Sequence, residues 1–352
     1  MVEKKGSDLL IAAGYPVTMR KFGELLVLGD KEPLSNQAVE DMLVAVLSEA
    51  EVETLRQQQD MDFAYQIEHP TDGFCRFRAN SFYQRFGASM VFRSIPRDIP
   101  TLAELGLPEE LGPSLMEFHQ GLVLVTGPTG CGKTSTLAAL VDHCNRSRAL
   151  NIITVEDPIE FVHKTKRSLI VQRQVGLHTD SYASALRASL REDPDLIMVG
   201  ELRDQETIAL AITAAETGHL VLGTLNTISA AQTINRIVNA FPPRQQSQTR
   251  MMLADSLRGV VSQQLLPRAD GSGRVVAVEV MLANGPIANL IRENKMHQVG
   301  SVMQTGSKKG MRLMDDSLLA HVKSGIVDPR EAMDRAHDKA SFIERANIGS
   351  RA

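Results

Sequence analysis

The stretch GLVLVTGPTGCGKTSTLAALVDHCN, residues 121–145, decides the fold of this chain of 352 residues. Residues 121–126 are an apolar run typical of a buried strand, and residues 133–145 have the composition of a helix. The loop between them fits the pattern G-x-x-x-x-G-K-S/T at Gly127, Gly132, Lys133 and Thr134. Strand, glycine loop and helix therefore follow one another in the order that a P-loop requires.

The P-loop pattern predicts how this loop would hold the phosphates of a nucleotide. Glycines let backbone N–H groups turn inward around phosphate oxygens, and the N-terminus of the next helix adds a partial positive charge. Lys133 is expected to reach the β- and γ-phosphates, and Thr134 to hold Mg²⁺. At Cys131 a small filler is favoured over a redox-sensitive thiol. The predicted nucleotide-binding residues are Gly127, Thr129, Gly130, Gly132, Lys133, Thr134 and Ser135.

Apolar and β-branched runs alternate with helical patterns after this loop. Helical patterns such as SYASALRASLRED (181–193) lie between the runs. Such alternation predicts the α/β class, with a mostly parallel sheet covered by helices on both faces, and the pattern turns helical after Pro286. The expected strands are NIITVEDP (151–158), DLIMVGE (195–201), HLVLGTLNT (219–227) and GRVVAVEVML (273–282).

Residues 1–98 have the features of a small α/β module of their own. Ser35 or Asn36 can cap a helix, and residues 73–95 alternate as two strands that turn near Gly87. A run with four prolines in residues 95–113 indicates a linker. The expected organisation is an N-terminal domain (1–98), a linker (99–113), a P-loop core (114–285), a helical region (286–343) and a disordered tail (344–352).

Composition excludes several classes of protein. The formal net charge of −4 and 4% aromatic residues disfavour a nucleic-acid partner. The three cysteines form no CxxC pair, which favours a reducing cytoplasm and argues against a disulfide or zinc framework. The N-terminus lacks the apolar core of a signal peptide, and Glu216 and His219 interrupt one of the longest apolar windows. We therefore expect a soluble protein with no membrane span.

A P-loop also needs an acid at the end of a neighbouring strand, to hold the metal or to orient water. Glu201 follows the apolar run of residues 195–200, and the segment ITVEDPIE supplies Glu156, Asp157 and Glu160. Two strands that end in acids behind a P-loop favour a catalytic role over solvated loop residues.

Four blocks of this sequence carry a resemblance to a known family. They are VTGPTGCGKTSTLAAL (125–140), TVEDPIEF (154–161), DPDLIMVGELRDQETIALAITAAETGHL (193–220) and MQTGSKKGM (303–311). Together they resemble the type IV pilus retraction ATPases, the PilT/PilU family of secretion-type motor ATPases. The resemblance covers nearly the whole chain, and its acid-rich blocks are far more specific than the P-loop alone.

The resemblance implies a homohexameric ring whose subunits have a PAS-like α+β domain (1–98) and a RecA-like ATPase core (114–285). It implies hydrolysis of ATP with Mg²⁺, which powers pilus retraction and twitching motility through an inner-membrane platform protein. Such a motor is cytoplasmic and peripheral at the inner membrane through that partner. A paralogous motor ATPase is a further partner that the resemblance suggests.

The resemblance also implies roles for single residues. The second glutamate of the EDPIE block orients the attacking water in the family, and this role falls on Glu160. Glu201 matches the Walker B acid near Mg²⁺, so Thr134 and Glu201 are the expected metal residues. The family supplies arginines from the N-terminal domain in the ring, and the matching positions are Arg78 and Arg93. A guanidinium that reaches the γ-phosphate can add about 10³-fold or more in rate.

The chain departs from the family pattern at Asn226, where the family commonly has a histidine. An asparagine amide is neutral at all ordinary pH, whereas an imidazole can change its charge near neutrality. Asn226 is therefore a candidate phosphate sensor with altered chemistry. Ala288 also replaces an arginine of the family within PIANLIRE (286–293).

These departures leave alternatives to the retraction motor open. Asn226 favours a low-turnover accessory or regulatory paralogue. A pilus or secretion assembly ATPase of the same superfamily would usually carry a four-cysteine zinc module and a long N-terminal extension, which this sequence does not have. Fold alone also permits a nucleic-acid motor, which the acidic charge disfavours.

Overall fold

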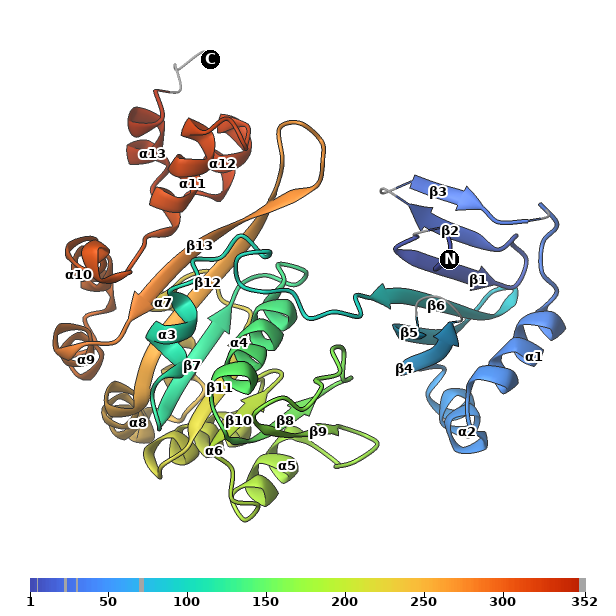
Figure 1. Cartoon of the computed structure of the whole chain (residues 1–352), viewed down its shortest axis with the longest axis horizontal. Coiled ribbons are helices and arrows are strands. Elements are labelled where there is room, and N and C mark those ends of the chain that lie inside the picture. The colour runs from blue at the N-terminus through green and yellow to red at the C-terminus, as the bar shows by residue number, and fades with distance from the viewer. Residues whose placement is uncertain (5, 22–23, 30, 70–72, 348–352) are drawn as a thin grey trace. The chain divides into compact units, whose positions relative to one another are not determined.

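The computed structural model describes residues 1–352 except 5, 22–23, 30, 70–72 and 348–352 (Figure 1). The chain divides into two compact units, and each is described here by itself. Unit 1 comprises Met1–Asp98 and Pro158–Val162, and unit 2 comprises Ile99–Asp157 and His163–Ala352. In the described part of the chain, no helix has both the length and the apolar character that a membrane span needs.

Unit 1 is built on a six-stranded antiparallel sheet in the order β3-β2-β1-β6-β5-β4. Its strands are β1 (Asp8–Ala12), β2 (Thr18–Lys21), β3 (Glu24–Val27), β4 (Asp60–His69), β5 (Gly73–Gln84) and β6 (Gly87–Ile95). The expected turn near Gly87 therefore joins β5 to β6. Two helices accompany the sheet, α1 (Asn36–Val46) and α2 (Glu49–Gln58).

Side-chain caps start both helices of unit 1. The Ser35 hydroxyl accepts a hydrogen bond from the backbone N–H of Ala38, so Ser35 is the cap of α1. Ser48 and Glu51 form a capping box at the start of α2. Asn36 does not cap the helix. Its side-chain oxygen accepts a hydrogen bond from the backbone N–H of Ala88 on β6, which connects α1 to the sheet.

Unit 2 is built on a seven-stranded sheet in the order β13-β12-β7-β11-β10-β8-β9. The strands from β12 to β9 are parallel to their neighbours, and β13 is antiparallel to β12. The predicted, mostly parallel sheet is thus confirmed. Its strands are β7 (Gly121–Thr126), β8 (Asn151–Glu156), β9 (Leu169–Gln174), β10 (Leu196–Val199), β11 (Leu220–Leu225), β12 (Leu257–Pro267) and β13 (Arg274–Leu282).

Helices cover both faces of this sheet. On one face lie α3 and α4, and on the other lie α5 to α8. The bounds are α3 (Leu111–Met116), α4 (Lys133–Ser147), α5 (Tyr182–Ser189), α6 (Gln205–Glu216), α7 (Ala230–Asn239) and α8 (Pro243–Ser256). Leu102 and Leu107, in the segment expected to be a linker, are buried against the face that carries α4.

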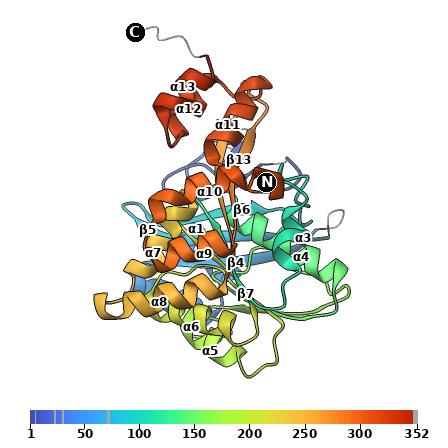
Figure 2. The ribbon, with the colours of Figure 1, turned by 90° about the vertical axis from the view of Figure 1, so that its left-hand side faces the viewer.

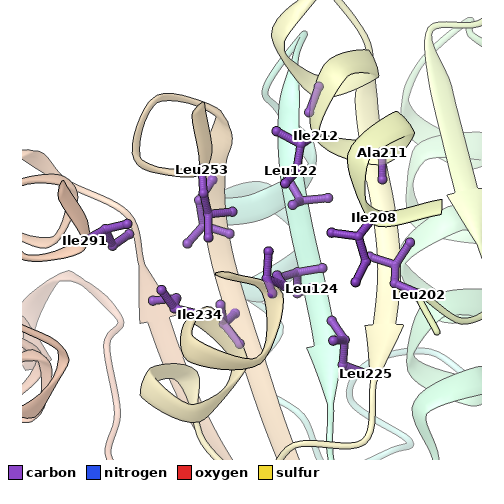
Figure 3. Packing of buried hydrophobic residues seen from close by; sticks show 14 of the residues in the cluster. Leu122, Leu124, Leu202, Ile208, Ala211, Ile212, Leu225, Ile234, Leu253 and Ile291 are labelled. Carbon is purple, nitrogen blue, oxygen red and sulfur yellow. The ribbon is translucent and has the colours of Figure 1, made fainter. Parts of the chain in front are cut away.

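The central strand β7 divides the apolar core into two clusters. Val123 and Val125 pack with α3 and α4. Leu122 and Leu124 point to the other face, where residues of α6, α7 and α8 surround them (Figure 3). Side chains alternate along a strand, so a continuous apolar run is what a strand covered on both faces requires.

The C-terminal part of unit 2 is helical, as the sequence predicts. Helices α11 to α13 gather around the ends of β12 and β13, where Leu266, Ala277 and Phe342 share one buried cluster (Figure 2). Of the expected tail 344–352, Glu344 and Arg345 belong to α13, and residues 348–352 lie outside the described residues. The elements are α9 (Gly285–Arg292), η1 (Met296–Gln298), α10 (Val299–Thr305), η2 (Ser307–Lys309), α11 (Met314–Lys323), α12 (Pro329–Arg335) and α13 (Lys339–Arg345).

Candidate functional site

Three adjacent parallel strands of unit 2 end at the same edge of the sheet, and each delivers one predicted site residue there. β7 leads through the glycine loop to Lys133, the first residue of α4. Asn226 directly follows β11, and Glu201 follows β10. Because β11 pairs with both β7 and β10, Asn226 lies between the other two side chains. Ligands gather at such carboxyl ends of parallel strands.

The three side chains are joined by hydrogen bonds. Lys133 Nζ donates to Asn226 Oδ1 at 2.8 Å, and Asn226 Nδ2 donates to Glu201 Oε1 at 2.8 Å. The asparagine amide can make both contacts because it carries an acceptor and a donor. Lys133 Nζ also donates to the Gly127 carbonyl oxygen at 2.7 Å, so the lysine lies along its own loop.

The two charged side chains of this group, Lys133 and Glu201, are only partly exposed to water. Burial lowers the pKa of Lys133, while the neighbouring Cys131 and Glu201 act in the opposite direction. Glu201 Oε2 accepts a hydrogen bond from Arg203 Nε at 2.7 Å. The Glu201 carboxylate therefore has one cationic partner, Arg203, and one amide partner, Asn226. The sequence analysis did not identify Arg203, although it lies two positions from Glu201.

Glycine is required at two positions of the loop for steric reasons. Gly127 has φ +143°, and a Cβ there would lie 2.2 Å from the Gln263 carbonyl oxygen. Gly132 has φ +93° and is the residue that precedes α4. Side chains other than hydrogen are strained in this region of backbone space. The loop thus turns sharply from β7 into the N-terminus of α4, the geometry that suits an anion.

A buried glutamine of β12 supports the loop from below. Gln263 Nε2 donates to the Cys131 carbonyl oxygen at 2.8 Å, and Gln263 Oε1 accepts from Thr136 Oγ1 at 2.9 Å. One amide therefore links the loop to the first turns of α4. Sequence analysis missed this residue, although the polar pair QQ within the apolar run of 257–267 was a signal, since buried polar side chains need partners.

The remaining loop residues differ in exposure. Thr129 and Gly130 are exposed at the tip, whereas Thr134 and Ser135 are half-buried in the first turn of α4. Cys131 is buried, and burial raises the pKa of its thiol. A buried thiol with a raised pKa is a poor nucleophile, so the structure favours the small-filler interpretation of Cys131.

Three other predicted site residues, Glu160, Arg78 and Arg93, belong to unit 1. Arg78 Nη1 lies 3.7 Å from Glu160 Oε1, and Arg78 Nη2 lies 3.8 Å from Asp62 Oδ2. Arg93 Nε donates to Asp8 Oδ1 at 2.8 Å. The structure thus brings Lys133, Asn226 and Glu201 together in unit 2, and pairs Arg78 with Glu160 in unit 1.

The alternative acid, Glu156, ends β8 in unit 2. Its carboxylate is buried and accepts hydrogen bonds from Thr154 Oγ1 at 2.7 Å and from Gln172 Nε2 at 3.0 Å. These contacts hold the carboxylate against its own strand and the adjacent β9.

A family model described as "Type II/IV secretion system protein" matches residues 28–306. The chain belongs to this family. It is 44% identical over 341 residues to the "Twitching motility protein" of Neisseria gonorrhoeae, covering 97% of this chain and 89% of that protein. It is 43% identical over 336 residues to the "Type IV pilus retractation ATPase PilT" of Pseudomonas aeruginosa, covering 96% of each chain.

A solved structure extends the similarity to three dimensions. This chain matches the solved structure described as "Crystal Structure of the Pilus Retraction Motor PilT and Bound ADP" with a TM-score of 0.88. The two sequences are 44% identical, and the match covers 97% of this chain and 96% of that chain. This likeness confirms the fold class expected from the sequence, with a β-rich N-terminal domain, a P-loop ATPase domain and C-terminal helices.

Replacing Gln263 with Ala removes its bonds to Thr136 and to the Cys131 carbonyl. We expect nucleotide affinity to fall about fivefold, because a net loss near 1 kcal/mol is typical when such bonds are lost. The measurement is a titration with a fluorescent nucleotide. Gln264→Ala is the matched control, since the next residue of a strand faces the opposite side. Equal affinities of the two variants would contradict a role for Gln263 under the loop.

Proposed function

We propose that this chain is an ATP-hydrolysing motor that powers type IV pilus retraction and twitching motility. The observation that carries the proposal is the Lys133–Asn226–Glu201 group beside the P-loop. It occurs in a chain that is 43% identical, over 96% of both lengths, to a protein named as a pilus retraction ATPase. Sequence similarity over a whole chain supports the same activity more strongly than a shared fold does.

The substrate in this proposal is ATP with Mg²⁺. Lys133 and the backbone N–H groups of the loop and of the first turn of α4 bind the phosphates, and Gly127, Thr129, Gly130, Gly132 and Ser135 complete the loop. The hydroxyl of Thr134 and the carboxylate of Glu201 suit Mg²⁺, which prefers oxygen ligands and takes others from substrate phosphates. The bound ion would neutralise charge that develops on the phosphates.

Two further sets of residues complete the proposed chemistry. Glu160 orients the attacking water, with Glu156 as the next candidate. Arg78 and Arg93 neutralise charge at the γ-phosphate, which requires that unit 1 of some subunit approach a nucleotide site. We propose a homohexameric ring for that reason. Hydrolysis in the ring drives domain closure and acts on an inner-membrane platform protein, which places the motor in the cytoplasm at that membrane.

A second candidate function rests on Asn226. A neutral amide contacts Lys133 and Glu201 where a histidine could become cationic, so a charge-assisted bond to phosphate is missing. This favours a motor with slow turnover, which could serve as an accessory or regulatory partner of a paralogous motor ATPase.

Lys133→Ala tests the ATPase proposal. Removing the cation from the phosphates is expected to abolish ATP turnover while the fold remains intact. Steady-state phosphate release and circular dichroism measure the two effects. Lys339→Ala is the control, because this exposed lysine begins α13. Wild-type turnover in the Lys133→Ala variant would rule out the P-loop as the site of hydrolysis.

Glu160→Gln tests the water-orienting role. We expect the variant to bind ATP but to lose about 100-fold or more in kcat, the usual size of a general-base contribution. Glu156→Gln, assayed in parallel, is expected to have a higher kcat than Glu160→Gln. If only Glu156→Gln lost turnover, the catalytic role would move to that residue.

Asn226→His tests the slow-motor hypothesis. A phosphate-sensing imidazole is expected to raise kcat several-fold, for a gain on the order of 1 kcal/mol, and to make kcat depend on pH between about 6 and 8. Asn235→His, at an exposed position of α7, is the control. An unchanged rate and pH profile in Asn226→His would mean that residue 226 only shapes the strand end.

A further inference from the structure

Glu279 is a buried acid that the proposed chemistry does not use. It lies within the apolar run VVAVEVML of β13, and only 4% of its surface is exposed. Burial raises the pKa of its carboxyl, and the hydrogen-bond donors around it oppose that shift. Burying a carboxyl group costs free energy unless its oxygens accept hydrogen bonds or pair with cations. The partners of Glu279 therefore indicate its structural role.

Those partners are the starts of two helices. Glu279 Oε1 accepts the backbone N–H of Ala230, the first residue of α7, at 2.7 Å. The backbone N–H of Met314, the first residue of α11, lies near enough to this carboxylate to lower its pKa. N–H groups in the first turn of a helix have no partner within the helix. The residue before α11 is Leu313, whose apolar side chain cannot accept a hydrogen bond, so Glu279 is a nearby carboxylate at a helix start that has no side-chain cap of its own.

Helix α7 is directly connected to the nucleotide site. Residues 227–229 join Asn226 to the start of α7. Thr227 of this segment contacts α7, because its Oγ1 lies 2.7 Å from Oγ1 of the buried residue Thr233. The position of Asn226 is therefore set by β11 on one side and by the start of α7 on the other. Glu279 holds that start.

Helix α11 is in turn connected to the last two helices. Its second residue, Asp315, accepts the backbone N–H groups of His337 and Asp338 at 2.7 and 3.0 Å. These two residues form the junction between α12 and α13. His337 Nδ1 also lies 3.7 Å from Glu279 Oε2. A continuous set of contacts therefore leads from Asn226 through α7, Glu279 and α11 to the α12–α13 junction.

We propose that Glu279 is a positioning residue that couples the Asn226 segment to helices α11–α13. One carboxylate accepts from the start of α7 and lies beside His337, which is bonded to Asp315 of α11, so a shift of α7 when Asn226 engages or releases a phosphate alters the contact between Glu279 and His337. The coupling is reciprocal, as linkage requires. The inference rests on the proposed function in one respect, namely that a bound nucleotide contacts Asn226.

The test compares hydrogen–deuterium exchange of residues 314–345 in the full chain with and without a saturating, non-hydrolysable ATP analogue and Mg²⁺. In the wild type we expect the analogue to change exchange at the amides of α11–α13 at least threefold. Glu279→Gln keeps the shape, but it removes the charge beside His337, and its NH₂ group cannot accept a hydrogen bond. We expect that the variant still binds the analogue and that the exchange response of α11–α13 disappears.

Two further variants make the test specific. Glu331→Gln, on α12, removes a charge that pairs with Arg335 and should respond as the wild type does. Asp315→Ala should retain the exchange response in α11 and lose it in α12 and α13. This variant also tests the coupling if Glu279→Gln does not fold. A purely structural role for Glu279 would lower stability without removing the response to the analogue.

The outcomes separate this proposal from the proposed function. A separate titration gives the analogue's Kd for each variant. A wild type that binds the analogue without any change in α11–α13, or a Glu279→Gln variant with the full response, overturns the coupling and leaves the ATPase proposal standing. A wild type that neither binds the analogue nor hydrolyses ATP overturns both.

Discussion

The parallel pairing of β7 with β11 on one side and β12 on the other is the constraint on which the site depends. β7 carries the loop, β11 carries Asn226 and β12 carries Gln263 beneath the loop. A parallel strand has its neighbours' carboxyl ends beside its own, so these residues meet without any long connecting loop. Apolar side chains on both faces of β7 hold the strand in register, because a slip of one residue would exchange its two clusters.

Within this frame, the polar contacts of the site are arranged around one neutral amide. Asn226 accepts from Lys133 and donates to Glu201, so it separates a cation from an anion that would otherwise attract each other directly. Arg203 holds the far oxygen of Glu201. Lys133 can therefore turn toward a phosphate by exchanging neutral partners, the amide oxygen and the Gly127 carbonyl, rather than by breaking a direct ion pair.

The arginines of unit 1 are held by contacts of different strength. Arg93 donates to Asp8 at 2.8 Å, and the pKa of that carboxyl, which burial raises, is lowered overall by the hydrogen bonds from Arg93 and Ser7. Arg78 lies 3.7 to 3.8 Å from its acids, which are more exposed than the Asp8 carboxylate that pairs with Arg93. Long, exposed ion pairs contribute little free energy. Within the proposed function, Arg78 would therefore leave its partners at a lower free-energy cost than Arg93.

The sequence by itself determined the local features of this protein. The apolar run and glycine loop of residues 121–134 predict strand, turn and helix, and the strand assignments around Glu201 and Asn226 were correct because each run is short, apolar and followed by a polar residue. The family blocks indicated the ATPase fold. β12 was not predicted, although it flanks β7 and supplies Gln263.

Only the tertiary structure decided which distant residues meet. The order of strands in the sheet places Asn226 between Lys133 and Glu201, and it places Gln263 under the loop. The burial of Glu279 at the starts of α7 and α11 is likewise invisible in a run that otherwise predicts only a strand. Periodicity and motifs report on neighbours along the chain, whereas strand order and buried hydrogen bonds depend on packing between segments far apart in sequence.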